Sequence, residues 1–449
     1  MSESTIDQST TREDGSRAMT DDASAIAESS MDAPLAGSLR PVATGERIEI
    51  LDILRGFAIL GILMVNMDLF FLPFATEFTG SSWWGAPIDV LASDFIHFVA
   101  QGKFFTMFSF LFGIGLAIQM ERAEAKGQRV GSFFRRRLFM LLLIGVFHGF
   151  VLWFGDILAQ YAALGFLLLL FRRRKAKTLK IWAAILLVLL PLLVIVGTGF
   201  QLAMLDIPAA AQDMQDAIAE REEETATRIA DLFEAYGNGS VGEVFAARAS
   251  ETLIVYTYTL AGGWAILAMF ILGLHFGRIG FFKNLRQKLP TLRRATSWLL
   301  PLGLVGSGLY VYSSHRSVPM EPSVWAGVSK VSFFIAGPAL CFAYIFLVCM
   351  AVQSPLGGRV FSALAPVGRM ALTNYLTHSV LMTTLSYSYG FGLYGRVPTS
   401  TGLVMTFCLF GLQILFSHWW LKRYRFGPAE WLWRSLTYGE RQPMRKGLP

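Results

Sequence analysis

The sequence is poor in charge and in cysteine. Of its 449 residues, 54% are hydrophobic and only 16% are charged, whereas soluble domains carry about 25% charged residues. This balance argues against a water-soluble globular domain. The three cysteines, Cys341, Cys349 and Cys408, all lie inside apolar runs. Their spacing supports neither a disulfide framework nor a metal site, and we expect no metal.

Several catalytic motifs are also missing. The chain has no Walker phosphate loop, no GxSxG elbow and no HExxH sequence, so no motif supports ATP hydrolysis, serine hydrolysis or zinc proteolysis. The net charge of +7 could suggest a nucleic-acid partner. The basic residues gather between apolar runs instead, as topology anchors do, so we predict no nucleic-acid binding.

Long uncharged apolar stretches dominate the chain. Runs of about 18 residues or more suffice to cross a hydrocarbon layer of about 30 Å. The pattern predicts an all-α fold, a polytopic helical membrane bundle with about ten transmembrane helices. Their expected limits are 54–72, 104–120, 138–155, 157–171, 181–203, 252–275, 297–313, 331–352, 371–389 and 402–421. Residues 86–101 alternate at helical spacing, which is typical of an interfacial helix or a partial span.

The chain divides into three parts by composition. Residues 1–46 are rich in Ser, Thr, Asp and Ala without an aromatic residue, which predicts a disordered cytoplasmic tail. Residues 47–421 form the transmembrane bundle. Within it, residues 201–251 hold eleven acidic residues against three arginines and predict an outer helical segment, either a cap on the bundle or a lid. Residues 422–449 predict a cytoplasmic amphipathic tail that rests on the membrane or contacts a cofactor.

The distribution of lysine and arginine predicts the orientation. With a cytoplasmic N-terminus, the inner connections and C-terminal tail hold 27 basic residues and the outer connections hold 7. Cytoplasmic loops carry the excess of lysine and arginine in membrane proteins. Both termini are therefore predicted to be cytoplasmic, and the lipid bilayer is the first expected partner.

The stretch "HGFVLWFGDILAQYAALG", residues 148–165, places ionisable side chains between apolar runs. His148 falls near mid-membrane, where an imidazole either bonds to a neighbouring helix or acts as a general base. Asp156 follows at a tight turn and is predicted to cap the next helix. It could also orient His148, but eight residues of straight helix would separate the two by about 12 Å. A direct hydrogen bond is therefore not expected.

Other polar residues fall at mid-membrane depth in separate spans. Asn374 and His378 are four residues apart and share a helix face. Asn66 lies about 16 Å along the first span from Arg55; it either holds two helices together or polarises a ligand. We expect Asn66, His148, Asp156 and His378 to line one cavity that opens toward the basic inner rim.

The inner mouth of the first span carries Asp52 and Arg55 on one helix face. They form either a local ion pair or part of a site in which Arg55 binds an anion. Arg122 and the run Arg135, Arg136 and Arg137 lie at the same predicted depth. Guanidinium groups bind phosphate through a planar fork of donors. Of the two alternatives, the anion-binding site therefore makes the more specific prediction.

Four stretches resemble the YeiB-like bacterial membrane proteins, whose C-terminal half is a domain of unknown function (418). They are "RIEILDILRGFAILGILMVN", "GKFFTMFSFLFGIGLAIQMERA", "RRRLFMLLLIGVFHGFVLWFGDILAQYAALG" and "FGPAEWLWRSLTYG". They occur in order, and the resemblance covers residues 47 to 445. It implies a bacterial inner-membrane location and suggests a role in transport.

The opening "LDILRG" is also similar to the first span of transmembrane acyltransferases, such as heparan-α-glucosaminide N-acetyltransferase and the bacterial O-acyltransferases. That resemblance implies transfer of an acyl group from cytoplasmic acyl-CoA. Where the O-acyltransferases carry their catalytic histidine, this sequence has Asn66. Because asparagine cannot serve as a general base, the base must come from elsewhere, and His148 is the candidate.

The sequence thus favours a membrane acyltransferase. Its acyl-CoA cofactor, for example acetyl-CoA, would bind at the arginines, with Asn66 or Asn374 polarising the thioester and His148 deprotonating a small-molecule acceptor. Two alternatives stay open. The same polar residues could form the path of a small-molecule transporter or exporter, or they could be packing contacts of a structural or signalling protein. The pattern selects no oligomeric state.

Overall fold

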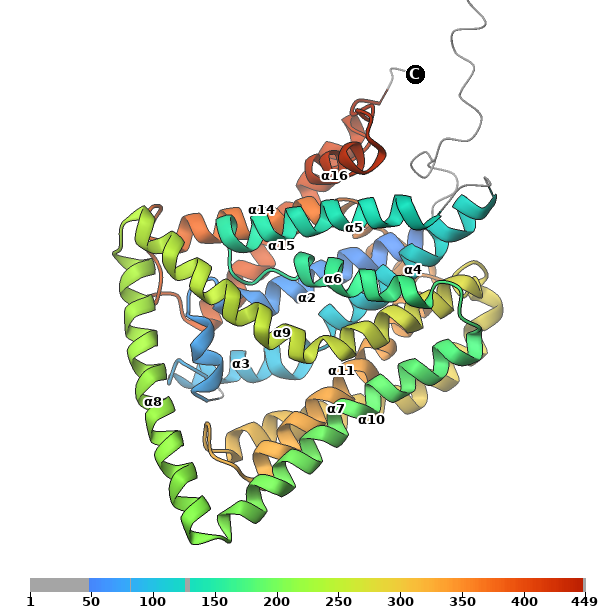
Figure 1. The fold of residues 1–449 in the computed structure, drawn as a ribbon. Helices are drawn as coiled ribbons and strands as arrows, with labels where there is room; N and C mark the ends of the chain where they lie inside the picture. Colours follow the sequence, from blue (N-terminus) through green and yellow to red (C-terminus); the bar gives the residue numbers. More distant parts are fainter. Residues whose placement is uncertain (1–47, 81, 126–129, 447–449) are drawn as a thin grey trace, which may run out of the picture.

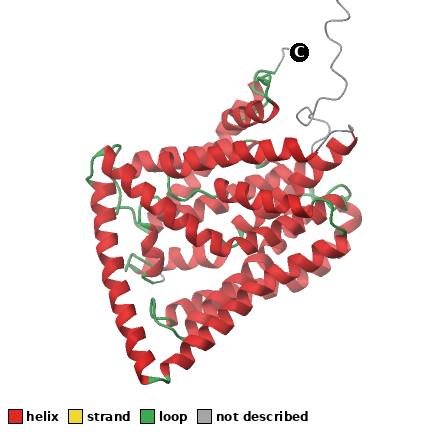
Figure 2. Cartoon of the chain, in the orientation of Figure 1, coloured by secondary structure: helices red, strands yellow, loops and turns green. Residues whose placement is uncertain are grey.

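The computed structural model describes residues 48–80, 82–125 and 130–446. The predicted disordered tail, residues 1–46, lies outside the described residues. The described part consists of helices and connecting loops (Figure 2). One isolated bridge joins Tyr424 and Arg445. The elements in chain order are α2 (Glu49–Leu69), η2 (Phe74–Phe78), α3 (Pro87–Val99), α4 (Phe104–Ala125), α5 (Val130–Phe147), η3 (His148–Leu152), α6 (Leu158–Leu168), η4 (Leu169–Phe171), α7 (Ala176–Leu205), α8 (Pro208–Gly237), α9 (Val241–Arg278), α10 (Leu285–Arg316), α11 (Val324–Ala351), α12 (Pro355–Ser362), α13 (Ala365–Arg369), α14 (Ala371–Ser386), α15 (Thr399–Arg423) and α16 (Pro428–Tyr438).

The long helices lie side by side, and α8 crosses one end of the bundle at a steep angle to them (Figure 1). We call this the acidic end, because α8 carries most of the acidic residues of segment 201–251. The opposite end, where α2 begins and where α4 and α9 finish, is called the basic end. α8 also contacts η2, which follows α2, so α2 runs from the basic end to the acidic end.

Helix α2 occupies the centre of the bundle. It packs against α4, α13, α14 and α15, and Ile53, Leu54, Ala58 and Leu63 are fully buried along it. Its apolar side chains thus face protein rather than lipid on several sides. Polar groups on the helices around α2 are shielded from the surroundings by the same packing.

The part of the chain that the structure describes contains five helices long and apolar enough to cross a membrane. A sixth is counted if the two halves of α9, bent by 60° between Leu260 and Gly262, form one span. The expected number of ten is not confirmed. The segment expected at 157–171 forms only a short apolar helix, Leu158–Phe171. Residues 86–101 form α3, which combines with α4 into a single candidate span.

Apolar side chains cover the outside of the bundle. Val188 and Val196 on α7 are 62% and 60% exposed, and Leu412 and Leu415 on α15 are 63% and 68% exposed. Continuous apolar surface of this kind is rare on soluble monomers and marks contact with a nonpolar environment. Together with the candidate spans, these exposed apolar sides of α7 and α15 identify the chain as a helical membrane protein.

Inside the bundle, α4 and α9 approach each other at glycines. A β-carbon at Gly113 would lie 2.1 Å from the carbonyl oxygen of Phe270, and one at Gly273 would lie 2.0 Å from that of Phe110. Any side chain at either position would force the two backbones apart. This contact fixes α4 and α9 beside the helices that carry the polar groups described next.

Candidate active site

The regular α-helix α5 ends at Phe147, next to His148, and the chain is irregular before α6 begins. After α5, the backbone makes the π-helical turn η3 and then becomes extended at Trp153, with φ −162° and ψ 135°. The indole of Trp153 is buried; its ring centroid lies 4.2 Å from that of Phe70, and its N–H donates to the carbonyl of Leu69 at 3.3 Å. These contacts anchor the connection to the acidic end of α2.

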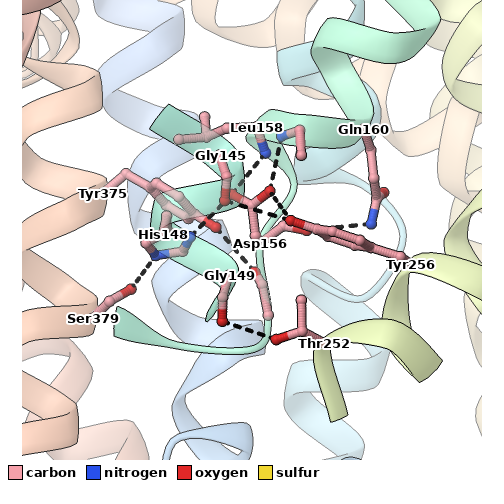
Figure 3. Close-up of polar contacts among 12 residues, drawn as sticks. Gly145, His148, Gly149, Asp156, Leu158, Gln160, Thr252, Tyr256, Tyr375 and Ser379 are labelled. Carbon is pink, nitrogen blue, oxygen red and sulfur yellow. Dashed lines mark hydrogen bonds and ion pairs between the residues drawn. The ribbon is translucent and has the colours of Figure 1, made fainter. Parts of the chain in front are cut away.

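The break brings Asp156 back to His148, where Nδ1 of the imidazole lies 3.0 Å from Oδ1 (Figure 3). The expectation that the two would not bond directly was wrong. It assumed a straight helix, whereas the π turn and the extended residues fold the chain back on itself. The predicted helix cap is confirmed. The carboxylate accepts from the backbone N–H groups of Leu158 and Ala159 at 3.0 and 2.8 Å.

A third side chain completes a row of hydrogen bonds. The Nε2 atom of His148 lies 2.7 Å from Oγ of Ser379 on α14, and all three residues are at most 1% exposed (Figure 3). Asp156 also accepts from the hydroxyl of Tyr256 at 3.1 Å. So many donors suit a carboxylate, which only accepts. The imidazole then carries its proton on Nδ1, and Nε2 is free to accept from Ser379.

The order serine, histidine, aspartate is the arrangement that unrelated acyl-transfer enzymes use, and it is recognised by geometry rather than by sequence. Sequence reasoning missed Ser379 because it lies in "LTHSVLM" without a local motif. Only the fold brings it against His148, a residue far away in the chain. The one available signal was its position within a polar stretch of an apolar helix.

Asn374 and His378 belong to a separate cluster between α14 and α15. Nε2 of His378 lies 2.8 Å from Oε1 of Gln413, whose Nε2 donates to the carbonyl of Asn374 at 3.1 Å. The side chain of Asn374 donates to Ser417 at 3.1 Å. Asn374 and His378 therefore share a face as expected, but that face meets α15.

The structure contradicts the expectation of one cavity lined by all the mid-membrane polar residues. His378 and Ser379 are successive residues on α14, and successive helical positions point about 100° apart. Ser379 meets His148, while His378 meets Gln413. Asn66 is half-buried on α2 and does not line the cavity described below. The structure thus places His148 and Asp156 together, and Asn66, Asn374 and His378 elsewhere.

A cavity of about 300 Å³ runs into the bundle from the basic end. It extends along α2 from Ile48 to Ile62, a length of about 21 Å at the rise of an α-helix. Its charged lining consists of five arginines and two carboxylates: Arg55, Arg122, Arg137, Arg369, Arg434, Asp52 and Glu430. The volume is at the lower end of ordinary ligand pockets, and the lining suits an anion at the mouth.

The predicted anion-binding residues divide between the cavity and the surface. Asp52 and Arg55 form an ion pair at 2.6 Å, and both line the cavity. Arg122 lines it too. Arg137 lines it with its guanidinium 3.7 Å above the ring of Trp433. The two hypotheses for Arg55, a local ion pair and a ligand site, are thus compatible.

Arg135 and Arg136 are exposed and do not line the cavity. They precede Arg137 directly on α5, and each step along a helix turns the side chain by about 100°. The sequence showed three equivalent arginines in a row. The helix presents Arg137 to the cavity and directs the other two away from it.

The inner end of the cavity reaches the neighbourhood of the Ser379–His148–Asp156 row. Tyr375 on α14 lines the cavity, and its ring centroid lies 4.9 Å from that of His148. Its hydroxyl donates to the carbonyl of Gly155 at 3.0 Å. Ser379 is one turn, about 6 Å, further along the same helix. Tyr375 therefore separates the cavity from the buried row.

Helix α16 forms one wall of the cavity and caps α14. Glu430 accepts from the backbone N–H groups of Leu372 and Thr373 at 2.6 and 3.1 Å, and from the Thr373 hydroxyl at 2.6 Å. Burial raises the pKa of the Glu430 carboxyl, and these hydrogen bonds oppose the rise. Trp433 and Arg434 add to the same wall. The C-terminal helix thus holds in place the helix that carries Ser379.

Replacing Glu430 with alanine is expected to lower the free energy of unfolding by about 1–3 kcal/mol, because three donors lose a buried acceptor. Thermal unfolding of the purified protein in detergent measures this. Glu440→Ala is the matched control, since Glu440 is exposed at the end of the same segment. Equal melting temperatures for the two variants would show that the cap does not stabilise the fold.

Within the described ranges, no group of three or more His, Cys, Asp or Glu side chains lies close enough to hold a metal ion. The groups that the site does supply are the Asp156 carboxylate, the His148 imidazole and the Ser379 hydroxyl. The resulting class is a helical membrane protein with a buried serine–histidine–aspartate row beside an arginine-lined cavity.

Comparison with known proteins identifies the family of the chain. The family model described as "Protein of unknown function (DUF418)" matches residues 276–440. The uncharacterized protein YxaH of Bacillus subtilis (strain 168) is 35% identical over 426 residues, covering 91% of this chain and 98% of the relative. The uncharacterized protein YeiB of Escherichia coli (strain K12) is 29% identical over 394 residues, covering 87% and 96%.

The chain belongs to the YeiB-like family of membrane proteins that carry the DUF418 region. An uncharacterized 39.9 kDa protein of Bacillus acidopullulyticus is also similar, at 27% identity over 90% of this chain and 97% of the relative. None of the three names specifies an activity.

Proposed function

We propose that this protein is a membrane-embedded acyltransferase that takes its acyl group from a CoA thioester. The observation that carries the proposal is the course of the cavity, from five arginines at the basic end to Tyr375 beside His148. A CoA thioester has phosphates at one end, a long thin arm, and a reactive carbonyl at the other end. The cavity offers charge at its mouth and then length, and the base His148 lies behind Tyr375 at its inner end.

The orientation follows from the same charges. The basic end faces the cytoplasm, where acyl-CoA is found, because cytoplasmic connections carry the excess of lysine and arginine. The bilayer is the inner membrane of a bacterium, with both termini on the cytoplasmic side. The nucleotide binds at the arginine rim outside the bundle, and the pantetheine arm follows α2 inward.

The phosphates are bound by Arg55, Arg122 and Arg137, joined by Arg369 and Arg434, which line the same rim. The planar fork of a guanidinium matches phosphate oxygens. Asp52 and Glu430 are already engaged, with Arg55 and with the N-terminus of α14. The rim therefore keeps a positive balance for the ligand.

His148 acts as the general base. Its Nδ1–H is held by Asp156 at 3.0 Å, so the lone pair of Nε2 points at a hydroxyl and accepts its proton. A buried, water-poor site favours transfer to an acceptor over hydrolysis, because few water molecules compete. Positioned proton transfer of this kind contributes about a hundredfold to ten-thousandfold in rate.

Two neighbouring arginines give a matched test of the donor site. Arg137→Gln is expected to raise the Kd for acetyl-CoA by about tenfold to a hundredfold, because a charge-assisted hydrogen bond contributes about 1.5–3 kcal/mol. Arg135→Gln should change it by less than about twofold, since exposed charges are screened. Isothermal titration of the purified protein with acetyl-CoA measures both.

If both variants bind as the wild type does, the cavity is not the donor site. If the wild type binds no acetyl-CoA while vesicles containing it transport a solute along a pH gradient, the protein is a transporter or exporter. The first result comes from the acetyl-CoA titration and the second also needs the vesicle transport assay, so the two outcomes are distinguishable.

A further inference from the structure

We propose that Ser379 carries the acyl group between donor and acceptor, so that transfer proceeds through an acyl-serine intermediate. This inference rests on the proposed function and deepens it. In this scheme, the hydroxyl that His148 first deprotonates belongs to Ser379 and not to the acceptor. An acceptor would then never meet the CoA thioester, and donor and acceptor would react in two successive half-reactions.

The hydrogen bonding of α14 distinguishes Ser379 from its neighbours. A hydroxyl inside a helix commonly donates to the carbonyl four residues earlier. Thr377, Thr383 and Thr384 do this, at 2.7 Å in each case. The Oγ of Ser379 instead lies 2.7 Å from Nε2 of His148. The serine is thus held by the base and not by its own helix.

The burial of the serine suits an ester intermediate. Ser379 and His148 are 0% exposed and Asp156 is 1% exposed, so bulk water does not reach the row. An ester formed there is protected from hydrolysis until an acceptor arrives. Burial also requires the donor to be admitted. Tyr375 stands between the cavity and the serine, so its ring must turn aside before the thioester carbon reaches Oγ.

The chemistry balances without an oxidant or a metal. In the first half-reaction Ser379 gives its proton to Nε2 of His148, Oγ bonds to the thioester carbonyl carbon, and the carbon–sulfur bond breaks. The departing thiolate takes the proton from His148 and leaves as free CoA. In the second, an acceptor hydroxyl or amine gives its proton to His148 and attacks the ester carbon. The bond to Oγ breaks, and Ser379 recovers the proton.

The experiment incubates purified protein with acetyl-CoA in the absence of acceptor, then measures released CoA and the mass of the peptide that contains Ser379. We expect a burst of CoA close to one per protein molecule and an acetyl group on Ser379. Ser379→Ala and His148→Ala should lose both signals. Ser386→Ala should keep them, because that serine is buried on the same helix but donates to the carbonyl of Phe70.

The acetyl adduct decides the inference: an adduct on Ser379 that Ser386→Ala keeps and His148→Ala loses supports it.

Two failures are distinguishable. If acetyl-CoA binds but CoA is released only after an acceptor is added, or if Ser379→Ala keeps the wild-type rate while His148→Ala loses it, transfer is direct. The serine intermediate is then overturned and the acyltransferase survives. If acetyl-CoA does not bind at all, the proposed function and this inference both fall.

Discussion

Replacing His148 with alanine is expected to slow acyl transfer by about ten-thousandfold, the upper range for a positioned acid–base group. Among the described residues, the imidazole alone lies within hydrogen-bond distance of both the Ser379 hydroxyl and the Asp156 carboxylate; Figure 3 shows it between the two. Without it, no group accepts the proton of the attacking hydroxyl or returns a proton to the leaving thiolate. Single-turnover release of CoA measures the loss, with acetyl-CoA binding preserved.

His378→Ala is the matched control for this prediction. Both histidines are buried at 1% exposure or less, and Nε2 of each lies within hydrogen-bond distance of a side chain on another helix. Nε2 of His378 meets Gln413 and not the row beside the cavity. Its removal should lower the melting temperature and leave the rate per folded molecule near the wild-type value. Equal losses of rate in the two variants would contradict the assignment of His148.

Asp156→Asn is expected to lower the rate by about a thousandfold to ten-thousandfold while the fold is retained. With its oxygen in the place of Oδ2, an asparagine still accepts from the N–H of Ala159 and keeps that part of the α6 cap, while its amide nitrogen takes the place of Oδ1 beside His148. Its amide nitrogen cannot accept the Nδ1 proton of His148. The imidazole would then present the wrong tautomer to Ser379, with a hydrogen on Nε2 in place of a lone pair.

The measurement is the single-turnover rate together with the melting temperature. Tyr256→Phe serves as the control, because it removes one hydrogen bond to Asp156, of 3.1 Å, but leaves its bond to His148. It should cost less than about tenfold, the size of one ordinary hydrogen bond. A rate for Asp156→Asn as high as that of Tyr256→Phe would show that the carboxylate acts only as a helix cap.

The sequence located part of this site because some of its signals are local. An imidazole and a carboxylate between apolar runs stand out by composition, so His148 and Asp156 were identified. Arginines at a span boundary stand out too, and Arg55, Arg122 and Arg137 all line the cavity.

The rest depends on features that composition does not encode. The bond between His148 and Asp156 requires the π turn and the extended residue Trp153, which no periodicity reveals. Ser379 is one hydroxyl among several on α14. Only the rotation of α14 about its own axis in the folded protein directs this side chain to His148. The same rotation separates it from His378, which the sequence had placed in the same cavity.

The fold, like the site, could be predicted only in part from the sequence. Hydropathy predicts helices correctly, because an apolar run of sufficient length has few alternatives in a membrane. It predicts their number less well. The helix Leu158–Phe171 covers the stretch expected at 157–171 but is too short to count as a candidate span, and the break at η3 and Trp153 interrupts the span expected at 138–155.

The central claim is that the acyl end of a CoA thioester reaches Tyr375 through the arginine-lined cavity. A CoA thioester that carries a photoreactive diazirine in its acyl chain tests this directly, followed by mass spectrometry of the labelled peptides. We expect labels on the residues at the inner end, Ile157, Tyr161 and Tyr375, and loss of labelling when excess acetyl-CoA is added. Labels confined to the outer surface, or labelling that acetyl-CoA does not displace, would contradict it.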